Sequence, residues 1–363
     1  MTSQPRYLFI VCQKGAEGVC KAEVLANHRE FKLSFSRPGF VTFKCEDESV
    51  PEKLTLKTSF ARTYGWSVGS FKVTDARSQI TELCENEWLV KADHLHVFER
   101  DTDLPGSRGF EPGATVLANE VGQQVVANLE GSGITKPLNR SAKPDELVFD
   151  IAMVDPDQWF VGYHYAQTKF QRWPGGVPKI DTSTEVVSRA YYKLLEAMLW
   201  SGIQINAGDC CAEIGASPGG GCQLMLEKEA KVIAVDPAEM QPEIVAHPNL
   251  TYIRGRGREI RKKDLKDVRW LVCDINAVPN FTLDAVADIV TNQNCQRIRG
   301  IILTMKITDW KLAQGIEEWK KRVREFGFQV VKTRQLAFSR KEICLVGIRD
   351  KYALRASRKK ESR

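Results

Sequence analysis

The second half of this chain alternates between short apolar runs and helix-like stretches, and this pattern constrains the fold more than any other feature. From Asp181 onward, strand-like runs occur near residues 209–214, 231–235, 250–253, 270–274 and 299–304. Repeated strand–helix alternation is typical of a doubly wound parallel sheet, because parallel neighbours need a crossover connection. We therefore predict an α/β fold with a Rossmann-like sheet in this half of the chain.

The last part of the chain modifies that pattern. Two long strand-like runs, 328–338 and 342–349, are separated by only residues 339–341. So short a connection joins only antiparallel strands, because parallel strands need a crossover of about a dozen or more residues. The predicted sheet therefore has seven strands and ends in an antiparallel hairpin. Thr182 and Glu185 have the spacing of a capping box, which predicts that a helix begins there.

Changes of pattern also divide the chain into segments. The pattern of residues 1–168 predicts smaller α+β units, and the glycines and prolines near residue 175 indicate a linker. The predicted segments are 1–68 (α+β), 70–168 (α+β), 169–180 (linker), 181–350 (the α/β sheet) and 351–363 (a basic tail).

Composition excludes several classes of protein. The apolar run Tyr7–Cys12 is far too short to span a bilayer or to serve as a signal sequence, so we expect no membrane association and a cytoplasmic location. Ten cysteines without a Cys-x-x-Cys pair predict reduced thiols and no metal. His94 and His96 alternate on a strand-like run, but no third ligand lies near them in the sequence. Nothing in the sequence indicates an oligomeric state.

The net charge of +6 is concentrated in clusters. Residues 351–363 hold six basic residues and one acid, and residues 254–269 hold eight basic residues and three acids. Between Lys169 and Lys179 there are three basic residues and no acid, interleaved with Phe170 and Trp173. Basic clusters with aromatics suit a phosphate backbone and unstacked bases, although each cluster alone could be a solvated face. Together they predict RNA as a partner.

A glycine-rich turn follows the first strand of the predicted sheet. Glycines let the backbone approach a ligand closely, and the helix after the turn offers free N–H groups. Asp236 ends the next strand, 21 residues after Gly215, a spacing that suits a carboxylate on ribose hydroxyls. The G-x-G-x-x-G spacing of dinucleotide sites is absent, which favours a methyl donor over a nicotinamide cofactor. The candidate cofactor residues are Glu213, Gly215, Ala216, Ser217, Pro218, Gly219, Gly220, Asp236 and Asp274.

Four charged residues form the candidate reaction centre. Asp274 and Lys306 end strand-like runs, Glu342 begins one, and Lys193 lies in the helix-like stretch SRAYYKLLEAM. Open α/β sheets place their chemistry beyond the carboxyl ends of the strands. Each residue alone has a simpler explanation, such as a surface lysine or a strand-end cap. Their combined order and placement predict a site.

The segments SRAYYKL, EIGASPGGG, VCDI, LTMKI and SRKEICLV, in this order, resemble the FtsJ-like ribose 2′-O-methyltransferases over roughly residues 180–350. The resemblance implies S-adenosylmethionine as cofactor and Lys306 as general base, with Lys193, Asp274 and Glu342 orienting it and tuning its charge. The upstream region is similar to that of bacterial large-subunit ribosomal RNA methyltransferases that modify a cytidine. In those proteins, a ferredoxin-like unit and an RNA-binding THUMP domain precede the catalytic domain, which implies the same for residues 1–68 and 70–168.

Some questions stay open at this level. A free lysine titrates near ~10.4, so a lysine base needs burial or a neighbouring cation, whereas the two acids would oppose its deprotonation. The family often has Asp where this chain has Glu213 and an aromatic where it has Gly221, and no acid precedes Glu259 after the third strand. Alternative functions are 2′-O-methylation of transfer RNA, an mRNA cap or another RNA, and a non-catalytic RNA-binding or ribosome-assembly factor.

Overall fold

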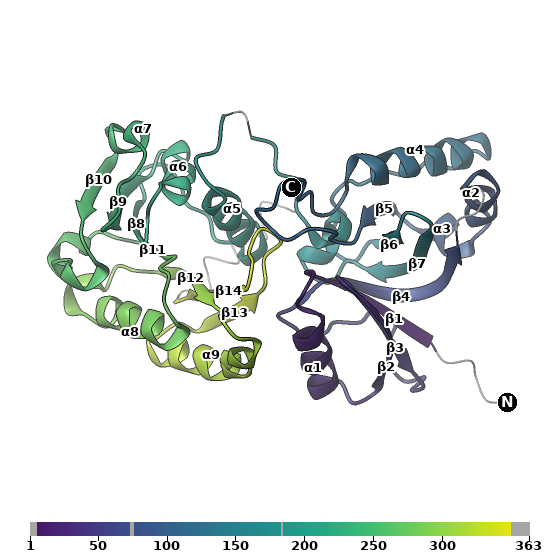
Figure 1. The fold of residues 1–363 in the computed structure, drawn as a ribbon, viewed down its shortest axis with the longest axis horizontal. Helices are drawn as coiled ribbons and strands as arrows, with labels where there is room; N and C mark the ends of the chain where they lie inside the picture. The colour runs from purple at the N-terminus through teal and green to yellow at the C-terminus, as the bar shows by residue number, and fades with distance from the viewer. Residues whose placement is uncertain (1–5, 73–75, 183, 350–363) are drawn as a thin grey trace. The chain divides into compact units, whose positions relative to one another are not determined.

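The computed structural model describes residues 6–72, 76–182 and 184–349 (Figure 1). The chain forms two compact units, divided between Lys179 and Ile180. This division lies next to Asp181, where the strand–helix alternation begins in the sequence. The basic tail predicted at 351–363 lies outside the described residues.

The first unit contains one continuous seven-stranded sheet. Its strand order is β2-β3-β1-β4-β7-β6-β5, and only β5 and β6 pair in parallel. The boundary predicted near residue 69 falls inside β4, so both predicted α+β segments contribute to the same sheet. The strands are β1 (Arg6–Cys12), β2 (Phe31–Arg37), β3 (Phe40–Cys45), β4 (Ala61–Lys72), β5 (His94–Glu99), β6 (Leu147–Asp155) and β7 (Gln158–Tyr165).

Helices of the first unit pack against this sheet at both ends of the strand order. Helix α1 contacts β2 and β3, whereas α4 contacts β5 and α2. Thr115 begins α4, because its hydroxyl accepts a hydrogen bond from Ala118 N at 3.2 Å. The helices are α1 (Glu17–Asn27), α2 (Ala76–Cys84), α3 (Glu87–Lys91) and α4 (Val116–Gly131).

The centre of this sheet is packed around Phe9 of β1. A Cβ added at Gly65 of β4 would lie 3.0 Å from the Phe9 side chain, and one added at Gly162 of β7 would lie 2.8 Å from it. The aromatic side chain therefore occupies the space that side chains at these two positions of β4 and β7 would need. Glycine inside a strand often marks such a close approach.

Residues 169–179 fold onto the first unit. They form two short 3₁₀ turns, η1 (Phe170–Arg172) and η2 (Pro174–Gly176), which contact β4 and β5. Phe170 is buried, with its ring centroid 6.1 Å from that of Tyr64. The sequence suggested that aromatics in this segment could stack on bases, and for Phe170 this is wrong because the ring is already packed inside the unit.

The second unit is the predicted Rossmann-like sheet. Its strand order is β10-β9-β8-β11-β12-β14-β13, parallel from β10 to β12 and antiparallel in the last two pairs. The seven strands and the terminal hairpin are confirmed, although β13 ends at Arg334, earlier than predicted. The strands are β8 (Cys210–Ile214), β9 (Lys231–Asp236), β10 (Leu250–Arg254), β11 (Trp270–Cys273), β12 (Gly300–Lys306), β13 (Val330–Arg334) and β14 (Glu342–Ile348).

Helices cover both faces of this sheet, with α5 and α6 on one face and α8 and α9 on the other (Figure 1). In neither unit is a described helix long and apolar enough to cross a membrane. The helices are α5 (Ala190–Ser201), α6 (Gly220–Glu227), α7 (Pro242–Val245), α8 (Pro279–Val290) and α9 (Ile316–Glu325).

Helix α5 begins at Ala190, so the predicted capping box at Thr182 and Glu185 is wrong. The physical reason is the side chain of Gln223 on α6. It donates a hydrogen bond to Glu185 O at 2.9 Å and accepts one from Val187 N at 2.9 Å. These contacts hold the segment in a non-helical conformation, and a helix would break them.

The first unit contains a buried ion pair that allows a stability prediction. The guanidinium of Arg62 donates two hydrogen bonds to Asp101, at 2.6 and 2.7 Å, and the two side chains are 3% and 1% exposed. We expect Asp101→Asn to destabilise this unit by about 3–5 kcal/mol, because it removes the carboxylate charge that contacts the buried guanidinium at two points. Denaturant unfolding of the full chain, monitored by tryptophan fluorescence, measures this change in the free energy of unfolding.

The matched control is Glu46→Gln in the exposed ion pair between Glu46 and Lys32. Solvent screens this pair, so the control is expected to unfold like the wild type. Equal midpoints for all three proteins would show that the Arg62–Asp101 pair does not stabilise the unit.

Candidate active site

The strand order brings the four predicted catalytic residues to one edge of the sheet. Lys306 is the last residue of β12 and Glu342 the first of β14, and the two are direct register partners. Asp274 follows β11, which pairs with β12 on its other side. Lys193 reaches the same place from α5. Residues 149 positions apart in the chain therefore come into direct contact.

These four side chains, which we call the charge tetrad, form a closed cycle of alternating charges. Lys306 Nζ donates to Asp274 Oδ1 at 2.8 Å and to Glu342 Oε1 at 2.7 Å. Lys193 Nζ binds the second oxygen of each acid, Glu342 Oε2 at 3.3 Å and Asp274 Oδ2. The side chains are only 10–19% exposed. Each carboxylate thus bridges both lysines.

The tetrad shows whether burial or the neighbouring acids dominate the pKa of Lys306, which the sequence left open. Burial by itself lowers the pKa of Lys306, but the carboxylates of Asp274 and Glu342 outweigh burial, and the net pKa is raised above the usual lysine value. Burial raises the pKa of Asp274, yet the two ammonium groups outweigh it and the net pKa is lowered. The acids therefore favour the ammonium form of Lys306 in the free protein.

The glycine turn lies against the tetrad. Gly215 follows β8 with φ +83°, and a Cβ at this position would lie 2.6 Å from Asp274 O. Asp274 N donates to Ile214 O at 2.9 Å. Glycine is required at 215 both by its backbone conformation and by this close approach. The candidate cofactor turn and a candidate catalytic residue are thus joined through the backbone.

Asp236 connects the glycine turn to the end of β9. Its Oδ2 accepts a hydrogen bond from Ser217 N at 3.1 Å, and its Oδ1 accepts one from Ala238 N at 2.8 Å. The Ser217 hydroxyl donates to Glu239 O at 2.7 Å. A carboxylate has about four acceptor positions, so Asp236 retains capacity for a ligand diol. This connecting role could not be predicted from the sequence, because Ser217 lies 19 residues before Asp236.

The other candidate cofactor residues lie in the same turn. Ala216 is buried, and its N–H donates to Val235 O at 3.3 Å. Pro218 O accepts from Gln241 N at 3.0 Å, which fixes the turn on its outer side. Gly219 is the N-cap of α6 and Gly220 its first residue. The turn is therefore rigidly held with the N-terminus of α6 behind it.

Glu213 and Gly221 fit together. Glu213 is buried in β8, and a Cβ at Gly221 would lie 2.2 Å from its Oε1. Cys222 Sγ donates to Glu213 Oε2 at 3.0 Å. The two departures from the family pattern compensate each other, because the longer acid occupies the space that a side chain at 221 would need. Burial raises the pKa of Glu213 to about 8.

Glu196 is a positioning residue that the sequence analysis missed. It is fully buried on α5, and its carboxylate accepts hydrogen bonds from Ala337 N at 2.9 Å and Phe338 N at 3.4 Å. These contacts fix the loop that leads into Glu342. The only available signal was its spacing, since Glu196 lies three positions after Lys193 and so on the same side of the helix.

The histidines of β5 have other partners. His94 Nε2 lies 2.9 Å from Glu146 Oε2, and His96 Nε2 donates to Arg140 O at 2.8 Å. Within residues 6–72, 76–182 and 184–349, no three His, Cys, Asp or Glu side chains are grouped so that they could hold a metal ion. All ten cysteines are free thiols.

Glu213 provides a pH-dependent stability prediction. Its pKa is raised from 4.5 to about 8 in the folded protein, so the folded state binds more protons between these values than the unfolded state does. The contribution of Glu213 to stability is therefore full below pH ~4 and is lost as the pH rises through 8. Since one pKa unit corresponds to about 1.4 kcal/mol, we expect wild type to lose at least about 1 kcal/mol more than Glu213→Gln between pH 5.5 and 8.5.

Denaturant unfolding of the second unit at both pH values measures this difference, with exposed Glu243→Gln as the control that should retain the wild-type pH dependence. Parallel pH dependence of wild type and Glu213→Gln would show that Glu213 is ionised in the folded protein at neutral pH.

Comparison with known proteins finds a family and individual relatives that resemble this part of the chain. Residues 186–348 match the FtsJ-like methyltransferase family. Ribosomal RNA large subunit methyltransferase M of Aromatoleum aromaticum is 28% identical over 181 residues, 47% of this chain and 48% of that protein. The protein of that name from Aeromonas salmonicida is 24% identical over 366 residues, 95% of this chain and 97% of that protein. The matched range contains the glycine turn and the whole charge tetrad, so the second unit of this chain is similar to the FtsJ-like methyltransferases over the part that holds the candidate site.

Proposed function

We propose that this protein transfers a methyl group from S-adenosylmethionine to a ribose 2′-hydroxyl of RNA, most specifically of a cytidine in large-subunit ribosomal RNA. The observation that carries the proposal is the closed charge tetrad beside the glycine turn. Similarity to large subunit ribosomal RNA methyltransferases along almost the whole chain supports the choice of RNA. The free thiols suit a reducing compartment, and we propose the cytoplasm.

The residues around the turn suit the proposed cofactor. Gly215 keeps the backbone free of a side chain beside Asp274, and Asp236 offers carboxylate oxygens for ribose hydroxyls. The first amides of α6 lie behind the turn. When bound, S-adenosylmethionine supplies an electrophilic methyl group. The contribution of Glu213 is to shape the floor of the turn through its contact with Gly221 and Cys222.

The tetrad directs the lone pair of Lys306. A neutral amine has two N–H groups and one lone pair, and the two carboxylates next to Lys306 Nζ each take one N–H. The lone pair then occupies the third direction, where a 2′-hydroxyl can be deprotonated. In this proposal, Lys306 is the general base, Asp274 and Glu342 orient it, and Lys193 holds both acids from their second oxygens.

RNA recognition is assigned to the first unit and to the basic surface of the second. We propose that residues 1–68 form a ferredoxin-like α+β part and that residues 70–168 form a THUMP-like RNA-binding part, with strands of both in one sheet. The cluster at 254–269, with eight basic residues and three acids, would bind phosphates. A non-catalytic assembly factor would not require the tetrad, and transfer RNA is distinguished from ribosomal RNA by the choice of substrate in the assay.

Replacing Lys306 tests the reaction. We expect Lys306→Ala to lower single-turnover methyl transfer to unmodified ribosomal RNA by about 10²–10⁴-fold, because the general base is lost. S-adenosylmethionine binding, measured by calorimetry, should change little. The control Lys231→Ala removes an exposed lysine at the start of β9 and should leave the rate unchanged. Wild-type methyl incorporation by Lys306→Ala would refute the proposed mechanism.

The pH dependence of the rate tests the roles of the acids. The raised pKa of Lys306 means that its neutral form grows with pH throughout the neutral and mildly alkaline range, so the rate should rise from pH 6.5 to 9.5. Glu342→Gln removes one of the two carboxylates that raise this pKa, so we expect the rise to shift to lower pH although the maximal rate falls.

Single-turnover rates across this range measure the shift, with exposed Glu325→Gln as control. A Glu342→Gln profile that coincides with the wild-type profile apart from its height would mean that Lys306 is not the group that titrates.

A further inference from the structure

One face of the parallel sheet is left uncovered at its edge. Ile233 of β9 and Ile253 of β10 are only half-buried, and Thr251, the register partner of Ile233, is exposed. Strands of a parallel sheet are ordinarily covered on both faces by helices. Apolar side chains that remain open to solvent here indicate a surface that another molecule can cover.

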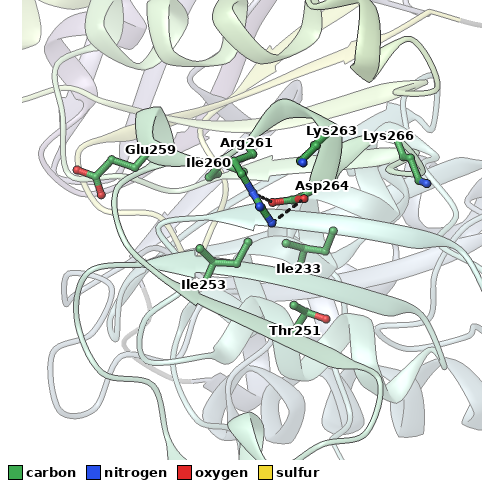
Figure 2. Close-up of a pocket in the computed structure, with 9 residues that line it drawn as sticks. All are labelled: Ile233, Thr251, Ile253, Glu259, Ile260, Arg261, Lys263, Asp264 and Lys266. Carbon is green, nitrogen blue, oxygen red and sulfur yellow. Dashed lines mark hydrogen bonds and ion pairs between the residues drawn. The ribbon is translucent and has the colours of Figure 1, made fainter.

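The cause is the connection between β10 and β11. It contains two 3₁₀ turns, η3 (Gly257–Glu259) and η4 (Lys262–Leu265), in place of a long helix. The groove that remains between the turns and the sheet has a volume of about 780 Å³. Figure 2 shows Ile233, Thr251 and Ile253 on the strand side and the charged residues opposite them. No member of the charge tetrad lines the groove, so it is separate from the proposed reaction centre.

The rim of the groove carries positive charge that has no internal partner. Arg261 is occupied by two hydrogen bonds to Asp264, at 2.9 and 3.2 Å (Figure 2). Lys263 and Lys266 are exposed, and neither forms an ion pair with any carboxylate in the described part of the chain. Two free ammonium groups above an apolar floor match a nucleotide, which combines an anionic phosphate with a flat, largely apolar base.

The positive charge of the rim also limits which molecules can bind in the groove. The chain's own C-terminal segment, 351–363, has six basic residues and one acid and would be repelled by this rim. The volume lies within the range of about 300–1,000 Å³ that is usual for ligand sites, which allows a base with its sugar. A polyanionic strand can bind both the positive rim and the apolar groove. Its adjacent phosphates can contact Lys263 and Lys266 while one base enters the groove.

We propose that this groove, bounded by β9, β10 and residues 259–266, binds a single-stranded segment of the RNA substrate that flanks the modified nucleotide. The inference rests on the proposed function and adds a second contact site to it. One unstacked base packs on Ile233 and Ile253, and its neighbouring phosphates pair with Lys263 and Lys266. The groove contributes to the affinity and placement of the RNA, and it takes no part in the methyl transfer itself.

The charge of the rim is tested with Lys263→Glu/Lys266→Glu. Its control, Lys321→Glu/Arg324→Glu, changes the net charge equally at exposed positions of α9, which does not line the groove. The probe is a labelled large-subunit ribosomal RNA fragment that contains the modified nucleotide and its single-stranded flanks, titrated at several salt concentrations. We expect the slope of log affinity against log salt to fall by about 1.4 in the rim variant, from two contacts of about 0.7 each, and to stay unchanged in the control. An unchanged slope in the rim variant, or an equal loss in the control, would overturn the proposal.

The apolar floor is tested without a change of charge. Thr251→Trp fills the groove from an exposed strand position, and we expect a loss of RNA affinity of about tenfold with an unaltered salt slope, since stacking of a base is worth about 1–3 kcal/mol. Wild-type affinity in Thr251→Trp overturns the groove as a base site. Saturable binding of free cytidine monophosphate as tight as that of the RNA would overturn the flanking strand as occupant, as would an acidic peptide that displaces the RNA.

The outcomes separate this inference from the proposed function. If both groove variants transfer methyl groups and bind RNA like the wild type, the groove is not an RNA-binding site, and the proposed reaction is unaffected. Loss of RNA binding in the variants, without methyl transfer by wild type, would support the groove and refute the reaction.

Discussion

The charge tetrad is the constraint on which the second unit depends. Its four groups are largely withdrawn from water, where an unpaired charge costs several kcal/mol. The arrangement is tolerated only because each carboxylate contacts both lysines and each lysine contacts both carboxylates. Such a cycle contributes little net stability compared with apolar packing. It fixes the relative positions of α5, β11, β12 and β14, and this fixed geometry is what the proposed reaction needs.

The surrounding scaffold holds the tetrad through backbone contacts. Gly215 allows the turn after β8 to approach Asp274 O, and Glu196 holds the loop before Glu342 by its backbone amides. Asp236 connects the same turn to the end of β9. Preorganisation of this kind matters because methyl transfer is an in-line displacement, whose rate depends on alignment of the reacting atoms. Glu196 and Asp236 therefore support the geometry of the tetrad from outside it.

The sequence predicted the sheet and the convergence of the tetrad because both follow from local patterns. Apolar runs give the strands, the three-residue link gives the hairpin, and charges at strand ends meet at one edge. The start of α5 could not be predicted, since Gln223 of another helix holds the preceding segment. The fit of Glu213 with Gly221 and the uncovered face at Ile233 likewise depend on contacts between distant segments. Such features become visible only when the three-dimensional packing is known.

The raised pKa of Lys306 is compatible with a role as base when the magnitudes are compared. An ordinary lysine pKa of ~10.4 leaves a neutral fraction of about 1 in 10³ near pH 7.4. The carboxylates of Asp274 and Glu342 raise the pKa of Lys306 and so lower its neutral fraction further. Holding a hydroxyl and a base in the correct geometry can provide effective molarities of about 10⁵–10⁸ M. Alignment of the hydroxyl with the amine can therefore offset the small neutral fraction of Lys306. The same two carboxylates cause both effects, because they stabilise the ammonium and also direct the lone pair once the proton has left.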